Sequence, residues 1–164
     1  MVARDDLVEL IEVKIEQQEV KSDVKQFFWV EGSLKDYKLH PSNEYIIALN
    51  KDHQNDSYYY IFNIELGDIR GKHKVPNSSS TLDLDPSGLY LSMIVDSNKV
   101  QIYELAKSTL ISEIATDLIQ INLHRFGGTG NDYLVVDSAT NTVKFYKIDP
   151  KLSGLIKKVQ YEMV

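Results

Sequence analysis

The sequence contains no cysteine in its 164 residues. Disulfide bonds, iron–sulfur ligation and thiolate catalysis are therefore excluded, and this composition fits a cytoplasmic protein. No apolar run reaches the roughly 18 residues that a transmembrane helix needs. The first residues, Met1–Asp6, lack the apolar stretch of a secretory signal. We therefore expect a cytoplasmic location, with the cytoskeleton as one candidate site of association.

Positive charge is also scarce. The chain has 18 lysines and arginines against 24 aspartates and glutamates, which gives a net charge of −6. Nucleic acids and anionic membranes are polyanions, so we expect neither as a partner. Protein partners with basic patches fit the charge better. Hydrophobic residues make up 43% of the chain, which is enough for a packed core and too much for a disordered protein.

The chain contains an internal repeat. His40-Pro41-Ser42 and Asp85-Pro86-Ser87 each open a polar turn followed by an apolar strand, at an offset of 45 residues (40 to 85). A third copy follows at an offset of 43 (90 to 133), with Asp132–Val136 set on Leu89–Met93. A period of about 40 to 45 residues with four short strands per unit is the pattern of propeller blades.

The repeat predicts an all-β fold with about three full blades and a partial one. We expect residues 1–33 to form an N-terminal partial blade or extension, and residues 34–164 to form three blades at 34–75, 80–115 and 118–160. The expected strands are 34–39, 45–49, 58–64 and 69–75 in the first blade, 81–84, 89–95, 100–105 and 110–115 in the second, and 118–123, 132–136, 142–148 and 155–159 in the third.

The second repeat resembles a WD40-type blade. The resemblance rests on the turn Pro86-Ser87-Gly88 inside Leu82–Leu91, and on the acidic turn and aromatic third strand of Asp96–Leu105. The blades are degenerate, because Tyr103-Glu104 stands where the family most often has Trp-Asp. The resemblance implies a β-propeller and a noncatalytic scaffold in a larger complex, as in cytoskeletal, ciliary, trafficking, ubiquitin-ligase or chromatin assemblies.

The first thirty residues allow two interpretations. Ile11, Val13 and Ile15 alternate as in a strand, and Phe27–Val30 forms a second apolar run. Val8, Ile11 and Ile15 also recur at helical spacing among good helix formers. We favour strands, because β-branched residues dominate the apolar positions.

Propellers typically close with four to eight blades, so we do not expect the ring to close within this chain. The remaining blades would then come from a longer chain, from a partner, or from a second copy. An unclosed stack also leaves sheet edges that can pair with another chain.

The candidate binding residues lie in the loops that join the second strand to the third and the fourth strand to the next blade. In a propeller these loops gather on one face, and here they are rich in Asp, Asn and Ser, which suits a basic peptide. The set is Asp52, His53, Asn55, Asp56, Asn77, Ser78, Asp96, Asn98, Asp117, Asp137 and Asn141.

The sequence assigns no catalytic, cofactor or metal residue. Asp52-His53-Gln54-Asn55-Asp56 brings potential metal ligands together, but zinc needs four convergent ligands and calcium a glycine-kinked loop of spaced carboxylates. The hypothesis we favour is a noncatalytic scaffold. One alternative is a propeller hydrolase or lactonase with a metal or acid–base site in its central channel, and another is a structural segment of a large assembly.

Overall fold

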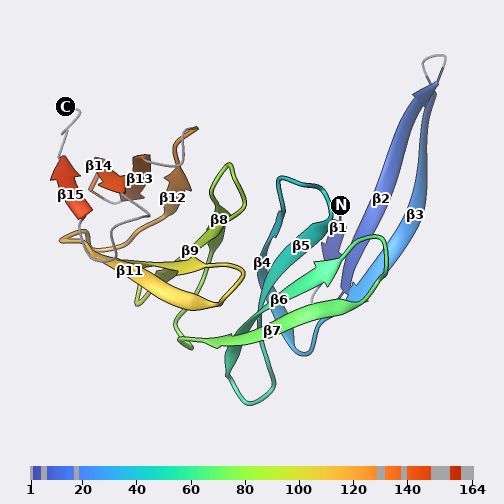
Figure 1. Cartoon of the computed structure of the whole chain (residues 1–164), viewed down its shortest axis with the longest axis horizontal. Coiled ribbons are helices and arrows are strands. Elements are labelled where there is room, and N and C mark those ends of the chain that lie inside the picture. Colours follow the sequence, from blue (N-terminus) through green and yellow to red (C-terminus); the bar gives the residue numbers. More distant parts are fainter. Residues whose placement is uncertain are drawn as a thin grey trace. The chain divides into compact units, whose positions relative to one another are not determined.

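A computed structural model gives the fold as an all-β chain (Figure 1). It describes residues 2–4, 7–16, 19–128, 132–137, 140–148 and 156–159, with side chains for 28–128, 132–137 and 140–147. No helix in this part of the chain is long and apolar enough to cross a membrane. The chain divides into two compact units, residues 1–39 with 43–77 and residues 40–42 with 78–164.

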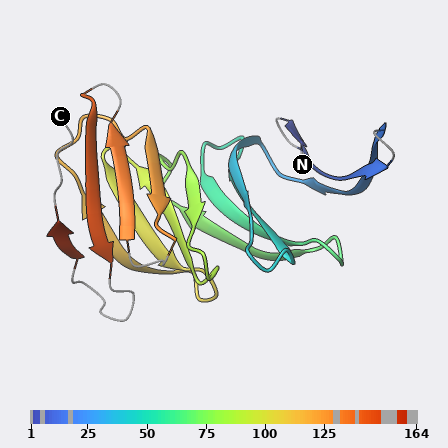
Figure 2. The same cartoon turned by 90° about the horizontal axis from the view of Figure 1, so that it is seen from above.

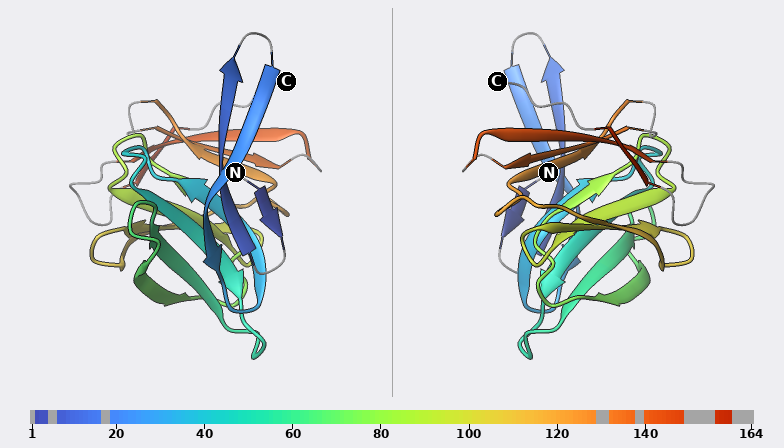
Figure 3. Two further views of the ribbon diagram at one scale, coloured as in Figure 1. Left: turned by 90° about the vertical axis from the view of Figure 1, so that its right-hand side faces the viewer. Right: turned by 90° about the vertical axis from the view of Figure 1, so that its left-hand side faces the viewer.

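The N-terminal residues form a three-stranded sheet in the order β1-β2-β3. β1 is Val2–Arg4, β2 is Leu7–Glu16 and β3 is Glu19–Trp29. β2 and β3 form a long antiparallel hairpin that projects away from the neighbouring sheet of the same unit (Figures 1 and 3). The helical alternative for this segment is wrong. The alternation of β-branched residues outweighed the helix propensity of Glu and Gln, because a paired strand buries one row of side chains.

Blade 1 completes the first unit. Its strands are β4 (Ser33–Leu39), β5 (Tyr45–Lys51), β6 (Ser57–Asn63) and β7 (Ile69–Val75), in the antiparallel order β4-β5-β6-β7. One face forms a buried cluster of Ile46, Ala48, Tyr60 and Phe62, together with Phe28 and Val30 from the end of the N-terminal sheet. The Phe28 and Phe62 rings pack 4.9 Å apart. The N-terminal sheet is thus held to blade 1 as one blade is held to the next.

His73 gives this blade a pH-dependent stability. The ring packs 4.9 Å from Tyr59, and burial lowers the pKa of His73 below its ordinary value. The unfolded chain therefore binds a proton more readily than the folded one, and stability falls as the pH drops below about 6.5. We expect His73→Phe, which keeps an aromatic ring against Tyr59, to lose less unfolding free energy than wild type between about pH 7.5 and pH 5.5. Urea unfolding at both pH values measures this difference, and equal losses in the two proteins would contradict it.

The second unit contains blades 2 and 3. Blade 2 consists of β8 (Leu82–Leu84), β9 (Tyr90–Val95), β10 (Lys99–Glu104) and β11 (Thr109–Ala115). Blade 3 consists of β12 (Leu123–Phe126), β13 (Asp132–Asp137), β14 (Thr142–Ile148) and β15 (Ile156–Val159). The two sheets stack face to face (Figure 2), with Ile94, Val100 and Ile102 of blade 2 in one cluster with Phe126, Tyr133, Val135 and Tyr146 of blade 3.

Most expected strands are confirmed within one or two residues, but the first strand of blade 3 is not. We expected it at 118–123, whereas β12 is Leu123–Phe126. Leu118 and Ile121 are instead buried residues of the connector, and they pack in the cluster between blades 2 and 3. Apolar residues occur both in strands and in buried connectors, so the apolar content of this segment did not distinguish the two.

The repeat register in blade 3 also needs a correction. Tyr103 pairs with Leu91 in blade 2, whereas Tyr146 pairs with Tyr133 in blade 3. Tyr133 therefore corresponds to Leu91, at an offset of 42 (91 to 133) instead of the 43 expected from the sequence. The reason is a longer turn, since β13 ends at Asp137 and β14 begins at Thr142, whereas β9 ends at Val95 and β10 begins at Lys99. A shift of one residue exchanges the two faces of a strand.

Candidate functional site

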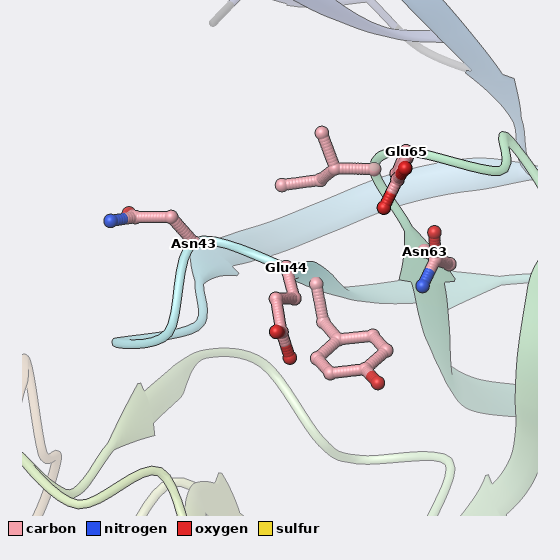
Figure 4. A pocket seen from close by; sticks show the side chains of 6 residues that line it. Asn43, Glu44, Asn63 and Glu65 are labelled. Atoms are coloured by element: carbon pink, nitrogen blue, oxygen red, sulfur yellow. The ribbon is translucent and has the colours of Figure 1, made fainter.

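A pocket of about 280 Å³ lies at one end of blade 1. Two turns form its walls, the one that leads into β5 and the one that follows β6 (Figure 4). The lining residues are Asn43, Glu44, Tyr45, Asn63, Ile64 and Glu65. All of them belong to the first unit.

Hydrogen bonds join the two turns and fix the second one. The Ile64 backbone N–H donates to the Glu44 carbonyl at 2.8 Å and so joins the two walls. In the second turn, the side-chain oxygen of Asn63 accepts the Leu66 N–H at 2.7 Å, and the Asn63 carbonyl accepts the Gly67 N–H at 3.0 Å. These hydrogen bonds fix the backbone of the second turn and join it to the first at Glu44.

The pocket is acidic and has an apolar border. Glu44 and Glu65 are both exposed, and no lysine, arginine or histidine is among the lining residues. Beside them, Leu66 is 60% exposed and Ile69 is 52% exposed. Carboxylates next to exposed apolar side chains suit a ligand that carries a cation flanked by apolar groups.

The sequence analysis did not predict this pocket, because its candidate residues lie in the loops at the opposite end of the strands. The sequence does place polar residues at this end of two neighbouring strands. Asn43-Glu44 stands directly before one strand, and Asn63, with Ile64-Glu65 after it, ends the antiparallel neighbour. Antiparallel neighbours place such positions at the same end of a sheet. Tyr45 and Asn63 are indeed cross-strand partners.

The predicted loop residues of the first unit meet at the other end of blade 1. Asp56 accepts hydrogen bonds from Lys74 at 2.6 Å and Asn77 at 3.2 Å, and these two contacts lower the pKa of Asp56. Asp52 caps its own turn by accepting the N–H groups of residues 54 and 56. His53 and Asn55 are exposed. The acidic side chains therefore hold the turns in place, whereas His53 and Asn55 face solvent.

Most of the predicted loop residues of the second unit also form contacts within their own unit. Asp96 accepts a hydrogen bond from Ser78 and lies 3.2 Å from the Lys99 ammonium, and these contacts lower the pKa of Asp96. The Asn98 carbonyl accepts the Thr116 backbone N–H at 3.1 Å. Asp117 forms an ion pair with Lys144, whose side chain is only 4% exposed. Asn141 is exposed, with a φ of 53°.

Asp137 differs from the rest of the set because it is fully buried. One carboxylate oxygen accepts the backbone N–H groups of Ile119 and Gln120 at 3.2 and 3.4 Å, and the other accepts the Thr140 N–H at 3.3 Å. Its carboxylate therefore faces the interior and fixes the connector between blades 2 and 3, in contrast to the surface position expected from the sequence.

A buried polar network between blades 2 and 3 was also missed. His124 of β12 contacts the hydroxyl of Thr81 at 2.9 Å and those of Ser92 and Tyr133. The Tyr133 hydroxyl donates to Ser92 at 2.8 Å, and burial raises the pKa of Tyr133 well above its ordinary value. Ser92 and Tyr133 are fully buried and His124 is 7% exposed. The network thus joins two blades and offers a substrate no access.

No group of three or more histidines and carboxylates among the described side chains could hold a metal ion. Candidate binding surfaces in this part of the chain are thus the acidic pocket and the exposed members of the loop set.

Comparison with known proteins identifies the fold. No protein-family model matches the sequence, and no curated protein matches it. Among solved structures, the chain is similar to the Dos1 propeller, with a TM-score of 0.69 at 16% identity over 85% of this chain and 37% of that one. It is also similar to a protein from Lactobacillus plantarum, with a TM-score of 0.73 at 17% identity over 94% of this chain and 48% of that one.

A third similar structure is Kuenenia stuttgartiensis hydrazine synthase, with a TM-score of 0.65 at 12% identity over 84% of this chain and 40% of that one. The chain thus spans less than half the length of each of these structures. At such low identities the likeness concerns the fold alone. Together with the four-stranded antiparallel sheets, it shows that the chain is built of β-propeller blades and forms part of a propeller.

Proposed function

We propose that this chain is a noncatalytic propeller module that binds protein partners within a larger complex, and that the acidic pocket of blade 1 receives a lysine or arginine side chain. The observation that carries the proposal is the presence of two glutamates, Glu44 and Glu65, in the lining of a pocket whose two walls are joined by the hydrogen bond from the Ile64 N–H to the Glu44 carbonyl. A cationic side chain placed between two carboxylates gains Coulomb energy from both.

The surroundings of the pocket support a peptide over a small cation. Leu66 and Ile69 border it with exposed apolar surface, which can pack against residues next to a lysine or arginine. The net charge of −6 favours the approach of basic segments from solution. The exposed loop residues His53, Asn55 and Asn141 remain candidates for a second contact surface. We place this activity in the cytoplasm, as the cysteine-free composition suggests.

Neutralising the pocket tests the proposal. The probe is a fluorescent extended peptide with one arginine between leucines. The control peptide is identical except that glutamine replaces the arginine. We expect the arginine peptide to bind the wild type more tightly, by an amount that shrinks with added salt. The double variant Glu44→Gln/Glu65→Gln should weaken that binding about tenfold, measured by fluorescence anisotropy.

The matched control is Glu104→Gln/Glu113→Gln, which changes the net charge equally but lies on blade 2. It should bind the arginine peptide like wild type. Equal weakening in both double variants would show a general effect of net charge and would contradict binding of the arginine in the pocket. Equal binding of the arginine and glutamine peptides would contradict the proposed ligand chemistry.

A further inference from the structure

An aromatic ring lines the acidic pocket of blade 1 together with the two carboxylates. Tyr45 belongs to the lining with Glu44 and Glu65, and it is half-buried, whereas both glutamates are exposed. Glu44 comes from the turn before β5 and Glu65 from the turn after β6 (Figure 4). Carboxylates attract lysine and arginine alike, because both side chains carry one positive charge. The tyrosine adds a surface on which a flat cation can stack, and so can distinguish one cation from the other.

The strand ladder fixes where the tyrosine side chain begins. Tyr45 and Asn63 are cross-strand partners at the end of β5 and β6. One residue further out, the Ile64 N–H donates to the Glu44 carbonyl at 2.8 Å, so that outer pair is hydrogen-bonded. The two kinds of pair alternate along an antiparallel ladder, so Tyr45 and Asn63 form a non-hydrogen-bonded pair. Such partners bring their side chains close together on one face of the sheet, which places Tyr45 beside the Asn63 carboxamide.

Three neutral acceptors of the lining already receive hydrogen bonds from the protein. The Glu44 carbonyl accepts the Ile64 N–H. Asn63 is used twice, because its carbonyl accepts the Gly67 N–H and its side-chain oxygen accepts the Leu66 N–H. A lysine ammonium group directs three donors from one nitrogen and needs several acceptors around it. The flat faces of a guanidinium are weakly hydrated and need no acceptor, so a lining with one ring and two carboxylates suits arginine better.

The corresponding end of blade 2 keeps the tyrosine but lacks both glutamates. Tyr90 begins β9 as Tyr45 begins β5. The Leu105 N–H donates to the Leu89 carbonyl at 2.8 Å, so the ladder ends there as it does in blade 1. The positions that correspond to the two pocket glutamates are Leu89 and Ala106. Tyr90 therefore has the same place in its own blade without those carboxylates, and it is a matched control for Tyr45.

We propose that the acidic pocket selects arginine over lysine, with the guanidinium stacked on the Tyr45 ring and its N–H edge directed to a carboxylate of the lining. This inference rests on the proposed function and specifies its ligand more closely. A guanidinium can stack with its face and donate with its edge at the same time, whereas an ammonium group has no flat face. Tyr45 is thus the residue that sets the specificity, and the two glutamates supply the attraction.

Three fluorescent peptides that differ at one residue test this selection on the unchanged protein. They carry arginine, lysine or citrulline between the same leucines, and citrulline keeps the planar end group without its charge. Fluorescence anisotropy should show the tightest binding for arginine, about fivefold tighter than for lysine, and the weakest for citrulline. An arginine peptide that binds no more tightly than the lysine peptide would overturn the inference and leave the proposed function standing. If neither cationic peptide bound more tightly than the citrulline peptide, both would be overturned.

Variants of Tyr45 test the role of the ring. Tyr45→Leu should weaken binding of the arginine peptide about fivefold and that of the lysine peptide about twofold or less, because only the guanidinium loses a stacking surface. Tyr45→Phe keeps the ring and should keep the preference, and Tyr90→Leu should leave both affinities unchanged. Circular dichroism shows whether each variant is folded, and the three-peptide comparison on the wild type needs none of them. An arginine preference that survives Tyr45→Leu, or an equal loss for both peptides, would overturn the inference.

Discussion

Gly32→Ala is expected to destabilise the chain by about 3 kcal/mol or more. Gly32 lies in the connector between β3 and β4 with a φ of +88°, a conformation that side chains with a Cβ rarely adopt. A Cβ there would overlap the carbonyl oxygen of Lys51 and lie 2.6 Å from the Cα of Asp52. These are backbone atoms of a strand end and its turn, so neither can move away without disturbing the sheet.

Urea unfolding monitored by circular dichroism measures this loss. Gly128→Ala is the matched control, because a Cβ at Gly128 meets no atom within 4 Å and its φ is not in the left-handed region. We expect that variant to keep wild-type stability within about 0.5 kcal/mol. Equal stability of the two variants would show that the connector between β3 and β4 relaxes to accept a side chain, and would remove the steric argument.

Asp137→Ala is expected to have the second large effect, a loss of about 3 kcal/mol. The substitution removes the acceptors of three backbone N–H groups, those of Ile119, Gln120 and Thr140. A fully buried donor without a partner costs about 1 to 3 kcal/mol. These three hydrogen bonds are part-buried, so each costs less, and the loss of about 3 kcal/mol is their sum. Asp137→Asn should recover little, because an amide oxygen accepts hydrogen bonds less strongly than a carboxylate and its NH₂ group adds donors beside existing ones.

Asp132 supplies the control for this prediction. It stands at the opposite end of the same strand, β13, and is exposed. Asp132→Ala removes the same charge and should change the unfolding free energy by less than about 0.5 kcal/mol. If the two alanine variants were equally stable, the anchoring of the connector by Asp137 would be wrong, and the burial of its carboxylate would have to be compensated elsewhere.

Much of the fold could be predicted from local patterns in the sequence. Turn residues and apolar runs located the strands of blades 1 and 2. The inner strands β5 and β9 bury nearly every residue, and turns rich in Pro, Gly, Asn or Asp separate the strands. The N-terminal strands followed from β-branched residues. The two predictions that failed, the position of the first strand of blade 3 and its repeat register, both depend on features that a local pattern does not show. Leu118 and Ile121 are apolar because a connector is buried, and the register of Tyr133 depends on the length of a turn.

The candidate site was harder to predict. Polar loop residues were expected to face a partner, yet Asp56 and Asp137 bind backbone or neighbouring side chains of their own unit. A sequence does not distinguish an aspartate that caps a turn from one that binds a ligand, because both functions place a polar residue in a loop. The acidic pocket depends on two turns 20 residues apart (44 to 64), which only the pairing of β5 with β6 brings together.

The buried network around His124 has a consequence for how the chain avoids misfolding. Repeat proteins with similar neighbouring units risk stacking in the wrong order, because any apolar sheet face can cover any other. Where His124 meets Thr81 and the Ser92–Tyr133 pair, a wrongly stacked blade would leave these groups buried and unsatisfied. The network therefore favours the stacking of blade 3 on blade 2 over other arrangements of the blades.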